Sequence, residues 1–168
     1  MKAWRKQPMI KIREIRAHDR ANIYDLMQQG DKIKSEELEA TLHQIDLSLF
    51  DVDQRLFKVV IAENESTDLL GYAVYGPDPR AAKTYQVYNL VYSPTIKNGE
   101  VLHHILKYIE NELARIKGRI ISIEISSHLR FKKQYDTYLE HNYNVTSRLS
   151  NFYSIGEDKL ILIKNIAP

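Results

Sequence analysis

The sequence predicts a mixed α/β (α+β) domain in which helices cover both faces of one sheet. Two observations lead to this fold class. Strand-length apolar or alternating segments recur along the chain, separated by segments whose apolar residues follow helical spacing. In the middle, a strand, a long helix and a second strand follow one another, which predicts a right-handed parallel β-α-β crossover. The predicted order is β, α, α, β, β, β, α, β, α, β, β.

The first third of the chain predicts one strand and two helices. Residues 10–15 alternate apolar and charged side chains, which favours a strand. Asp19 is placed to cap a short helix that Gly30 ends, and Ser35 is placed to cap a second helix. Helical spacing predicts their buried faces, with Ile23, Leu26 and Met27 in the first helix and Leu38, Leu42, Ile45 and Leu49 in the second.

The remaining elements follow from the same patterns. Residues 57–63 and 69–75 flank a polar turn and predict a hairpin, and residues 84–92 predict an aromatic-rich strand. The clearest helix spans about residues 99–117, with Gly118 at the expected C-cap. Its apolar stripe consists of Val101, Leu102, Ile105, Ile109, Leu113 and Ile116. The C-terminal part predicts a strand over 120–126, a helix over about 129–141, and strands over 143–150 and 159–165 that the excursion 151–158 joins.

Length and composition limit the class of protein. The chain has 168 residues, no cysteine and a net charge of +2. It therefore lacks disulfides, thiolate metal ligands and a cysteine nucleophile, and the small net charge argues against a nucleic-acid binder. We expect a flexible tail over residues 1–9 and a single domain over 10–166. The N-terminus has no signal-peptide pattern and no apolar run could span a membrane, so we expect a cytoplasmic protein without a membrane partner.

Residues 90–107 combine a strand end, a short loop and a helix start. The first turn of a helix offers unpaired backbone N–H groups and the positive end of the helix dipole, which favour an anion. Lys97, Asn98 and Gly99 suit a phosphate at this junction. The two adjacent histidines that follow, His103 and His104, point to different faces of the helix, so we interpret them as surface residues and predict no metal site. His141, at the end of the last helix, is predicted to be solvated or to line a cleft.

The order of elements and the C-terminal half resemble the GNAT superfamily of acyl-CoA-dependent N-acetyltransferases. The resemblance runs from about residue 10 to residue 164 and is strongest after Tyr85. It is carried by the strand end E-I-S-S at residues 124–127, by F-K-K-Q-Y-D-T-Y on the last helix, and by N-Y at residues 142–143. The turn N-F-Y-S-I-G-E-D-K at residues 151–159 completes it. It implies a mostly antiparallel sheet of about seven strands and transfer of an acetyl group from acetyl-CoA to a primary amine, as co-substrate and acceptor.

The resemblance also implies where the cofactor binds. The pyrophosphate is expected on the loop and helix start after the fourth predicted strand, and the pantetheine arm along the end of that strand. The corresponding residues are Leu90, Val91, Tyr92, Lys97, Asn98, Gly99, Glu100, Val101 and Leu102. The loop departs from the usual pattern because Lys97 stands where Gln or Arg is expected, and Glu100 and Leu102 replace two glycines. A bulky and an acidic residue there weaken cofactor binding.

By motif position, Tyr138 would be the general acid that protonates the leaving thiolate, since a phenol keeps its proton at neutral pH. It could equally belong to an aromatic core stripe on the last helix. Glu124 could be the general base, or a paired strand residue beside which a water relay acts. Tyr88 could contact the substrate or be a half-buried strand residue, and Tyr153 would border the acceptor site.

Three points remain open at this stage. The replaced loop glycines leave open a GNAT-like module that binds CoA or regulates, with weak or no catalysis. The acceptor, a small molecule or a peptide with an amine, is not determined by these motifs. The hairpin over residues 151–164 could also pair between two subunits, which would make the protein a homodimer.

Overall fold

The computed structural model describes residues 9–29, 34–50, 56–96 and 99–166. These residues form a seven-stranded sheet in the order β1-β2-β3-β4-β5-β7-β6. All neighbouring strands are antiparallel except β4 and β5. The predicted fold class is therefore confirmed. The strands are β1 (Lys11–Glu14), β2 (Lys58–Glu63), β3 (Leu69–Pro77), β4 (Thr84–Tyr92), β5 (Ile120–Ser126), β6 (Asn144–Ser154) and β7 (Glu157–Asn165).

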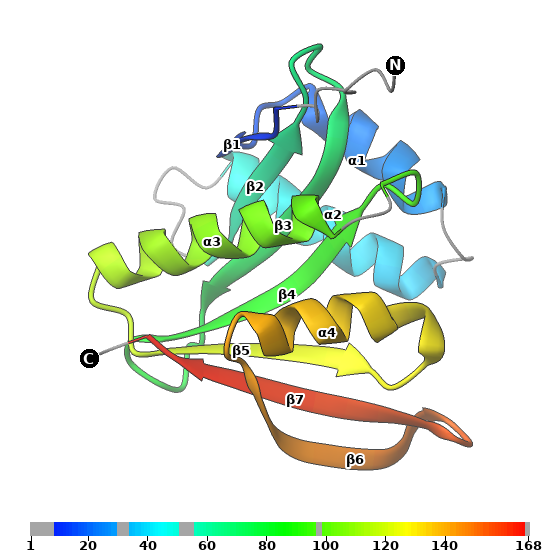
Figure 1. Ribbon diagram of the computed structural model, residues 1–168. Helices are drawn as coiled ribbons and strands as arrows, with labels where there is room; N and C mark the ends of the chain where they lie inside the picture. Colours follow the sequence, from blue (N-terminus) through cyan, green and yellow to red (C-terminus); the bar gives the residue numbers. More distant parts are fainter. Residues whose placement is uncertain (1–8, 30–33, 51–55, 97–98, 167–168) are drawn as a thin grey trace, which may run out of the picture.

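Helices lie on both faces of this sheet (Figure 1). One face carries α1 (Asp19–Gln28) and α2 (Ser35–Phe50). The other carries α3 (Glu100–Arg115) and α4 (Lys132–Glu140), and a short 3-10 turn over Leu129–Phe131 precedes α4. Two cores result because side chains of a strand alternate between faces. On β2, for example, Val59 and Ile61 pack with α1 and α2, whereas Val60 and Ala62 pack with α3.

Arg13 ties β1 to α1 and β2. Its Nη1 and Nη2 donate to the two carboxylate oxygens of Asp19 at 2.6 and 2.8 Å, and its Nε donates to Glu63 at 2.7 Å. The side chains of Asp19 and Glu63 are buried, and that of Arg13 is 10% exposed. The prediction that Asp19 caps α1 is wrong, because His18 occupies the N-cap and the Asp19 carboxylate also accepts the backbone N–H of Arg16 at 2.7 Å. Gly30, the predicted end of this helix, lies outside the described residues.

The end of α3 differs from the prediction by one residue. Lys117, not Gly118, adopts the left-handed conformation, with φ of 59°. The N–H of Gly118 donates to the carbonyl of Leu113 at 2.8 Å, as in a Schellman motif. Glycine is required there by close approach, since a Cβ would lie 2.9 Å from the Leu113 oxygen. Ile116, predicted within the buried stripe, is 47% exposed because the helix has ended.

The C-terminal hairpin is more regular than predicted. The predicted excursion is mostly strand, and Ile155 and Gly156 form the turn between β6 and β7. Asn151 departs from strand geometry with φ of 55°. Its N–H donates to Asp158 at 2.8 Å, and Asp158 also accepts from Arg148. These contacts keep the two strands paired on both sides of the irregular residue.

The parallel pairing of β4 and β5 is short, and this positions the candidate site. Residues 84–87 pair with residues 120–123, although both strands continue further. A bulge begins at the same point, because Tyr75 pairs with Val87 and Val74 with Asn89, which leaves Tyr88 as the extra residue of β4. Beyond Val87, β4 pairs with β3 alone and β5 with β7 alone. We call this region, residues 88–92 and 124–126, the β4–β5 splay.

Candidate active site

The splay leaves one edge of β4 without a neighbouring strand. The backbone groups of residues 88–92 that face β5 find no ladder partner there, so they can pair with an extended ligand. Leu90, Val91 and Tyr92, three predicted cofactor residues, all lie on this segment. Leu90 and Tyr92 pack toward α3 and α4, whereas Val91 packs toward α1 and α2.

The start of α3 lies just beyond this strand. Gly99 is the N-cap and is left-handed, with φ of 65°. The first helical hydrogen bond runs from the His103 N–H to the Gly99 carbonyl at 3.0 Å, so the amides of Val101 and Leu102 precede it. Both side chains are fully buried. Only their amides can therefore serve an anion. Lys97 and Asn98, the other predicted residues of this loop, lie outside the described residues.

Helix α4 approaches the start of α3. A Cβ at Gly99 would lie 3.4 Å from Lys133 Cε and 3.4 Å from Thr137 Oγ1. The Lys133 stem thus passes beside the helix N-terminus and brings a cation to the predicted anion site. Glu100, in the first turn, adds a negative charge at the same end. Sequence reasoning missed Lys133, because only tertiary packing brings residue 133 next to residue 99.

Tyr138 lies inside the core on the α3 and α4 face, with 1% exposure. Its hydroxyl oxygen accepts a hydrogen bond from Gln134 Nε2 at 2.6 Å, which leaves the phenolic proton available for donation. Burial is the main cause that raises its pKa, and the nearby Tyr92 contributes. The phenol therefore stays protonated throughout the physiological range. Its ring also packs at 5.8 Å from that of Tyr143.

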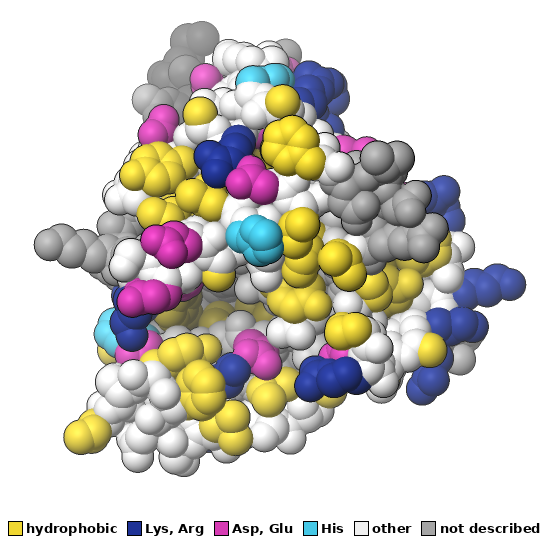
Figure 2. Space-filling model, turned by 180° about the vertical axis from the view of Figure 1, so that it is seen from behind, with side chains coloured by type: hydrophobic (Ala, Val, Ile, Leu, Met, Phe, Trp, Pro, Cys, Tyr) yellow, Lys and Arg dark blue, Asp and Glu magenta, His cyan; other side chains and the backbone are white. Residues whose placement is uncertain are grey.

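Glu124 lies on the opposite face of β5 from the core residues that surround Tyr138. It forms an ion pair with Lys159 of β7. Burial and the negative charges of Glu124, Glu37 and Glu157 raise the pKa of Tyr153, so these carboxylates from α2, β5 and β7 lie within electrostatic range of its hydroxyl. Figure 2 shows this face, where acidic side chains border a hollow. Glu124 thus lies within electrostatic range of Tyr153, on the face of β5 opposite the core that contains Tyr138.

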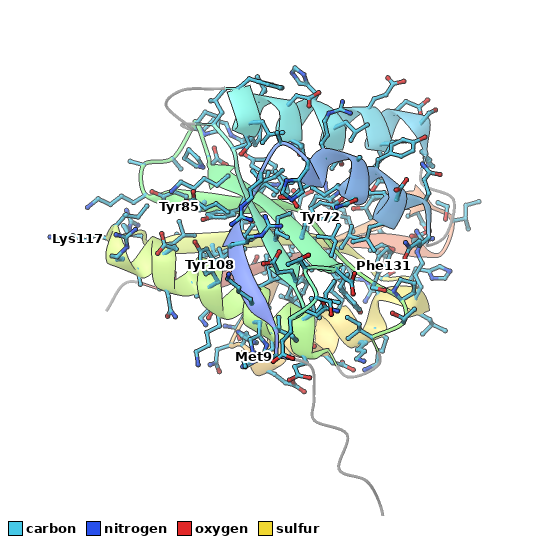
Figure 3. The ribbon with its side chains drawn as sticks, turned by 90° about the horizontal axis from the view of Figure 1, so that it is seen from above. Met9, Tyr72, Tyr85, Tyr108, Lys117 and Phe131 are labelled. Atoms are coloured by element: carbon cyan, nitrogen blue, oxygen red, sulfur yellow. The ribbon has the colours of Figure 1, made fainter. Side chains whose placement is uncertain are left out.

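Tyr88 points elsewhere. Its hydroxyl donates to the Pro77 carbonyl at 3.4 Å, and its ring meets Phe57 edge to face at 5.2 Å. Pro77 pairs with Tyr85 near the start of β4. In Figure 3, Tyr85 and Lys117 lie at one end of the molecule and Phe131, at the start of the α4 segment, lies at the other. The Tyr88 hydroxyl therefore faces away from the splay.

A histidine pair joins α3 to the end of α4. His141 Nε2 lies 2.7 Å from His103 Nδ1, and His141 Nδ1 lies 3.2 Å from Glu110. His141 is buried, which corrects the expectation of a solvated ring. Burial is the main cause that lowers the pKa of His103. Within residues 9–29, 34–50, 56–96 and 99–166, no three His, Asp or Glu side chains converge to hold a metal ion.

Solved structures share this fold. A protein from Desulfovibrio desulfuricans assigned to the GNAT family of acetyltransferases superposes with a TM-score of 0.85 at 22% identity, covering 95% of this chain and 100% of its own. The chain has the GNAT fold. The ribosomal-protein-S18-alanine N-acetyltransferase from Escherichia coli matches with a TM-score of 0.75 at 14% identity over 95% and 96% of the two chains.

A third GNAT-fold match was solved with a bound cofactor. It is a Salmonella typhimurium protein assigned as an acetyltransferase, crystallised with acetyl-CoA, with a TM-score of 0.74 at 14% identity over 95% of each chain. No family model matches this chain, and no curated protein matches it by sequence. The shared feature is therefore the fold. In the part of the chain that the structure describes, no helix is long and apolar enough to cross a membrane.

Proposed function

We propose that this chain is an N-acetyltransferase that transfers an acetyl group from acetyl-CoA to a primary amine. The observation that carries the proposal is the β4–β5 splay with the N-terminus of α3 beside its open strand edge. This combination suits a ligand that has an extended amide-bearing arm and a diphosphate. The amides of the pantetheine arm would pair with β4, and the diphosphate would accept hydrogen bonds from the first backbone N–H groups of α3.

The chain's residues fit the donor in most respects. The left-handed Gly99 opens the helix without a side chain over its amides, and Lys133 adds a positive charge nearby. Glu100 opposes both effects by repulsion. Acetyl-CoA would supply the thioester, so the protein itself needs no nucleophile. Catalysis then depends on positioning, proton transfer and a backbone N–H near the acyl oxygen.

The proton donor and the proton acceptor would lie on opposite faces of the sheet. Tyr138, on the α4 face, donates its proton to the sulfur as the carbon–sulfur bond breaks and the nitrogen–carbon bond forms. On the opposite face, Glu124 accepts the proton that the amine loses, directly or through water. Because Lys159 holds the Glu124 carboxylate, a bridging water fits this geometry better. The amine enters beside Tyr153 and the surrounding carboxylates, which favour a cationic acceptor.

A second candidate function is a CoA-binding module without catalysis. The full burial of Tyr138 favours it, because a general acid must reach the leaving sulfur and this hydroxyl is held by Gln134 inside the core. Both candidates share the donor site and differ in whether an amine is acetylated.

Isothermal titration with acetyl-CoA tests the donor site, and thiol release over a panel of primary amines tests the transfer. We expect Lys133→Gln to weaken acetyl-CoA binding about fivefold, which corresponds to about 1 kcal/mol for one half-buried charge near a phosphate. Lys132→Gln is the matched control, because Lys132 pairs with Asp136 at 2.6 Å on the outer surface of α4. Binding of acetyl-CoA without thiol release would support the CoA-binding module and overturn the transferase. Absence of binding would overturn both candidate functions.

A further inference from the structure

Helices α3 and α4 lie on one face of the sheet (Figure 1), and two histidine rings join them. His103 lies one turn into α3, and its backbone N–H donates to the carbonyl of Gly99 at 3.0 Å. His141 is the C-cap of α4, and its backbone N–H donates to the carbonyl of Thr137 at 3.0 Å. Because His141 Nε2 lies 2.7 Å from His103 Nδ1, the start of α3 is tied to the end of α4.

The second nitrogen of His141 fixes how the protons of this pair are arranged. Its Nδ1 lies 3.2 Å from Glu110 Oε1, and an ionised carboxylate can only accept, so Nδ1 carries a proton. In a neutral His141 the Nε2 atom is then an acceptor, and His103 Nδ1 donates to it. When His141 gains a proton, its Nε2–H becomes the donor and Nδ1 of a neutral His103 becomes the acceptor. The contact therefore persists with no added proton or with one.

A second added proton abolishes the contact. Both facing nitrogens then carry N–H groups, so neither can accept a hydrogen bond, and two positively charged rings repel each other. Glu110 cannot neutralise both rings, because Lys164 of β7 already binds its other carboxylate oxygen at 2.8 Å.

The surroundings of the pair oppose a second proton. Burial is the main cause that lowers the pKa of His103, and the positive charges of His141, His104 and Lys107 act in the same direction, whereas Glu110 opposes them. The other charged or titratable groups nearby are Glu100 one turn before His103, Glu140 beside His141, and Tyr143 and Lys164 around Glu110. The stability that the contact contributes is therefore complete above the pKa of the unfolded chain and is lost as pH falls through the lower pKa of the folded chain.

We propose that His103 and His141 form a proton-controlled latch, which holds the last turn of α4 against the start of α3 and opens when both rings are charged. Tyr138 lies in the turn that this latch holds, and its carbonyl accepts the N–H of Tyr143 at 3.0 Å. The neighbouring Thr137 packs toward Gly99 at the start of α3. The closed latch therefore keeps Tyr138 and the N-terminus of α3 in a fixed relation.

Two substitutions of the exposed His103 separate the closed and the open state. An asparagine amide lies where the imidazole Nδ1 lies and can donate or accept, but it does not titrate. His103→Asn should therefore keep the contact at every pH, whereas His103→Leu should lose it at every pH. His43→Asn is the matched control, because His43 is an exposed histidine of α2 on the other face of the sheet. Circular dichroism should show that all three variants are folded.

Hydrogen exchange of the full chain at about pH 7.5 and about pH 5, corrected for the intrinsic exchange rate, measures the latch. In the wild type, protection of the amides of residues 138–143 should fall at least about tenfold at the lower pH, relative to the amides of the central strand β3. His43→Asn should behave as the wild type. His103→Asn should keep full protection at both pH values, and His103→Leu should show the low protection at both.

Three results would overturn the latch. The first is equal protection of residues 138–143 at both pH values in the wild type. The second is a loss of protection at low pH in His103→Asn, which would assign the titration to another group. The third is full protection in His103→Leu at the higher pH.

The consequence for the donor site rests on the proposed function, whereas the latch itself does not. Isothermal titration with acetyl-CoA at both pH values tests it, and affinity should fall about fivefold more in the wild type than in His103→Asn. An equal fall in the two proteins would overturn this link. If acetyl-CoA does not bind while protection changes as expected, the proposed function fails and the latch is supported. If acetyl-CoA binds and protection does not change, the latch fails alone.

Discussion

Replacing Tyr138 by phenylalanine removes one buried hydroxyl and leaves the ring in place. The Gln134 amide then loses the acceptor that it holds at 2.6 Å. An unmade hydrogen bond at such a site costs about 1 kcal/mol, which lowers the melting temperature of a chain of this length by about 2–4 °C. The variant should therefore remain folded at 25 °C.

The expected effect on catalysis is larger. A general acid contributes about 10²–10⁴-fold to the rate, so Tyr138→Phe should lower kcat by at least about a hundredfold, or about 2.7 kcal/mol. The assay is thiol release at saturating acetyl-CoA and amine, with CoA affinity measured separately by titration. Affinity should change little, because the proton is transferred only as the thiolate leaves. The stability cost cannot account for such a loss.

Tyr143→Phe is the matched control. Its ring lies 5.8 Å from that of Tyr138. Its hydroxyl makes no hydrogen bond to the described residues. Burial is the main cause that raises the pKa of Tyr143, and the nearby Glu110 contributes. Removing an unpartnered hydroxyl should leave the free energy of unfolding and the rate almost unchanged. If the two variants have rates within about threefold of each other, Tyr138 is not the acid.

Two further predictions concern charges. Arg13→Met should lower the free energy of unfolding by about 3–5 kcal/mol, because it leaves the Asp19 and Glu63 carboxylates buried without their partner. Burial acts to raise the pKa of Asp19, but hydrogen bonds from Arg13 and from the Arg16 amide lower this pKa overall. The stabilisation that Asp19 contributes is therefore complete above the pKa of the unfolded chain. It is lost as pH falls through the pKa of the folded chain. Acid unfolding followed by circular dichroism should thus begin at higher pH in the variant, and an unchanged curve would contradict this role. Glu100→Gln should tighten acetyl-CoA binding about fivefold by removing a like charge, whereas Glu112→Gln at the far end of α3 should have no effect. Titration at low and high salt checks this, since the gain should shrink with salt.

The sequence predicted most strands closely because side-chain periodicity records burial directly. Residues 84–92 and 120–126 alternate or remain apolar over their full length, and the structure places β4 and β5 on these bounds. The end of α3 was less predictable. Glycine usually supplies the left-handed residue, yet crowding against Leu113 fixes Gly118 and moves that conformation to Lys117.

The candidate site depended on contacts that no local pattern records. The four-residue pairing of β4 with β5 and the bulge at Tyr88 arise from how three strands share one sheet. The approach of Lys133 to Gly99 depends on how α4 packs against α3. Motif position alone pointed to Tyr138 as the general acid. Its burial and its hydrogen bond from Gln134 could be learned only from the fold.

The short ladder between β4 and β5 also divides the sheet mechanically. Four residue pairs join the N-terminal four strands to the C-terminal three, as few as at the short β1–β2 edge and fewer than at each of the other four junctions of the sheet. A ligand lying between the diverging strands would act as an inserted strand and stiffen this junction on both sides. A bound ligand would then reduce the relative motion of the two parts of the sheet, including residues that it does not contact.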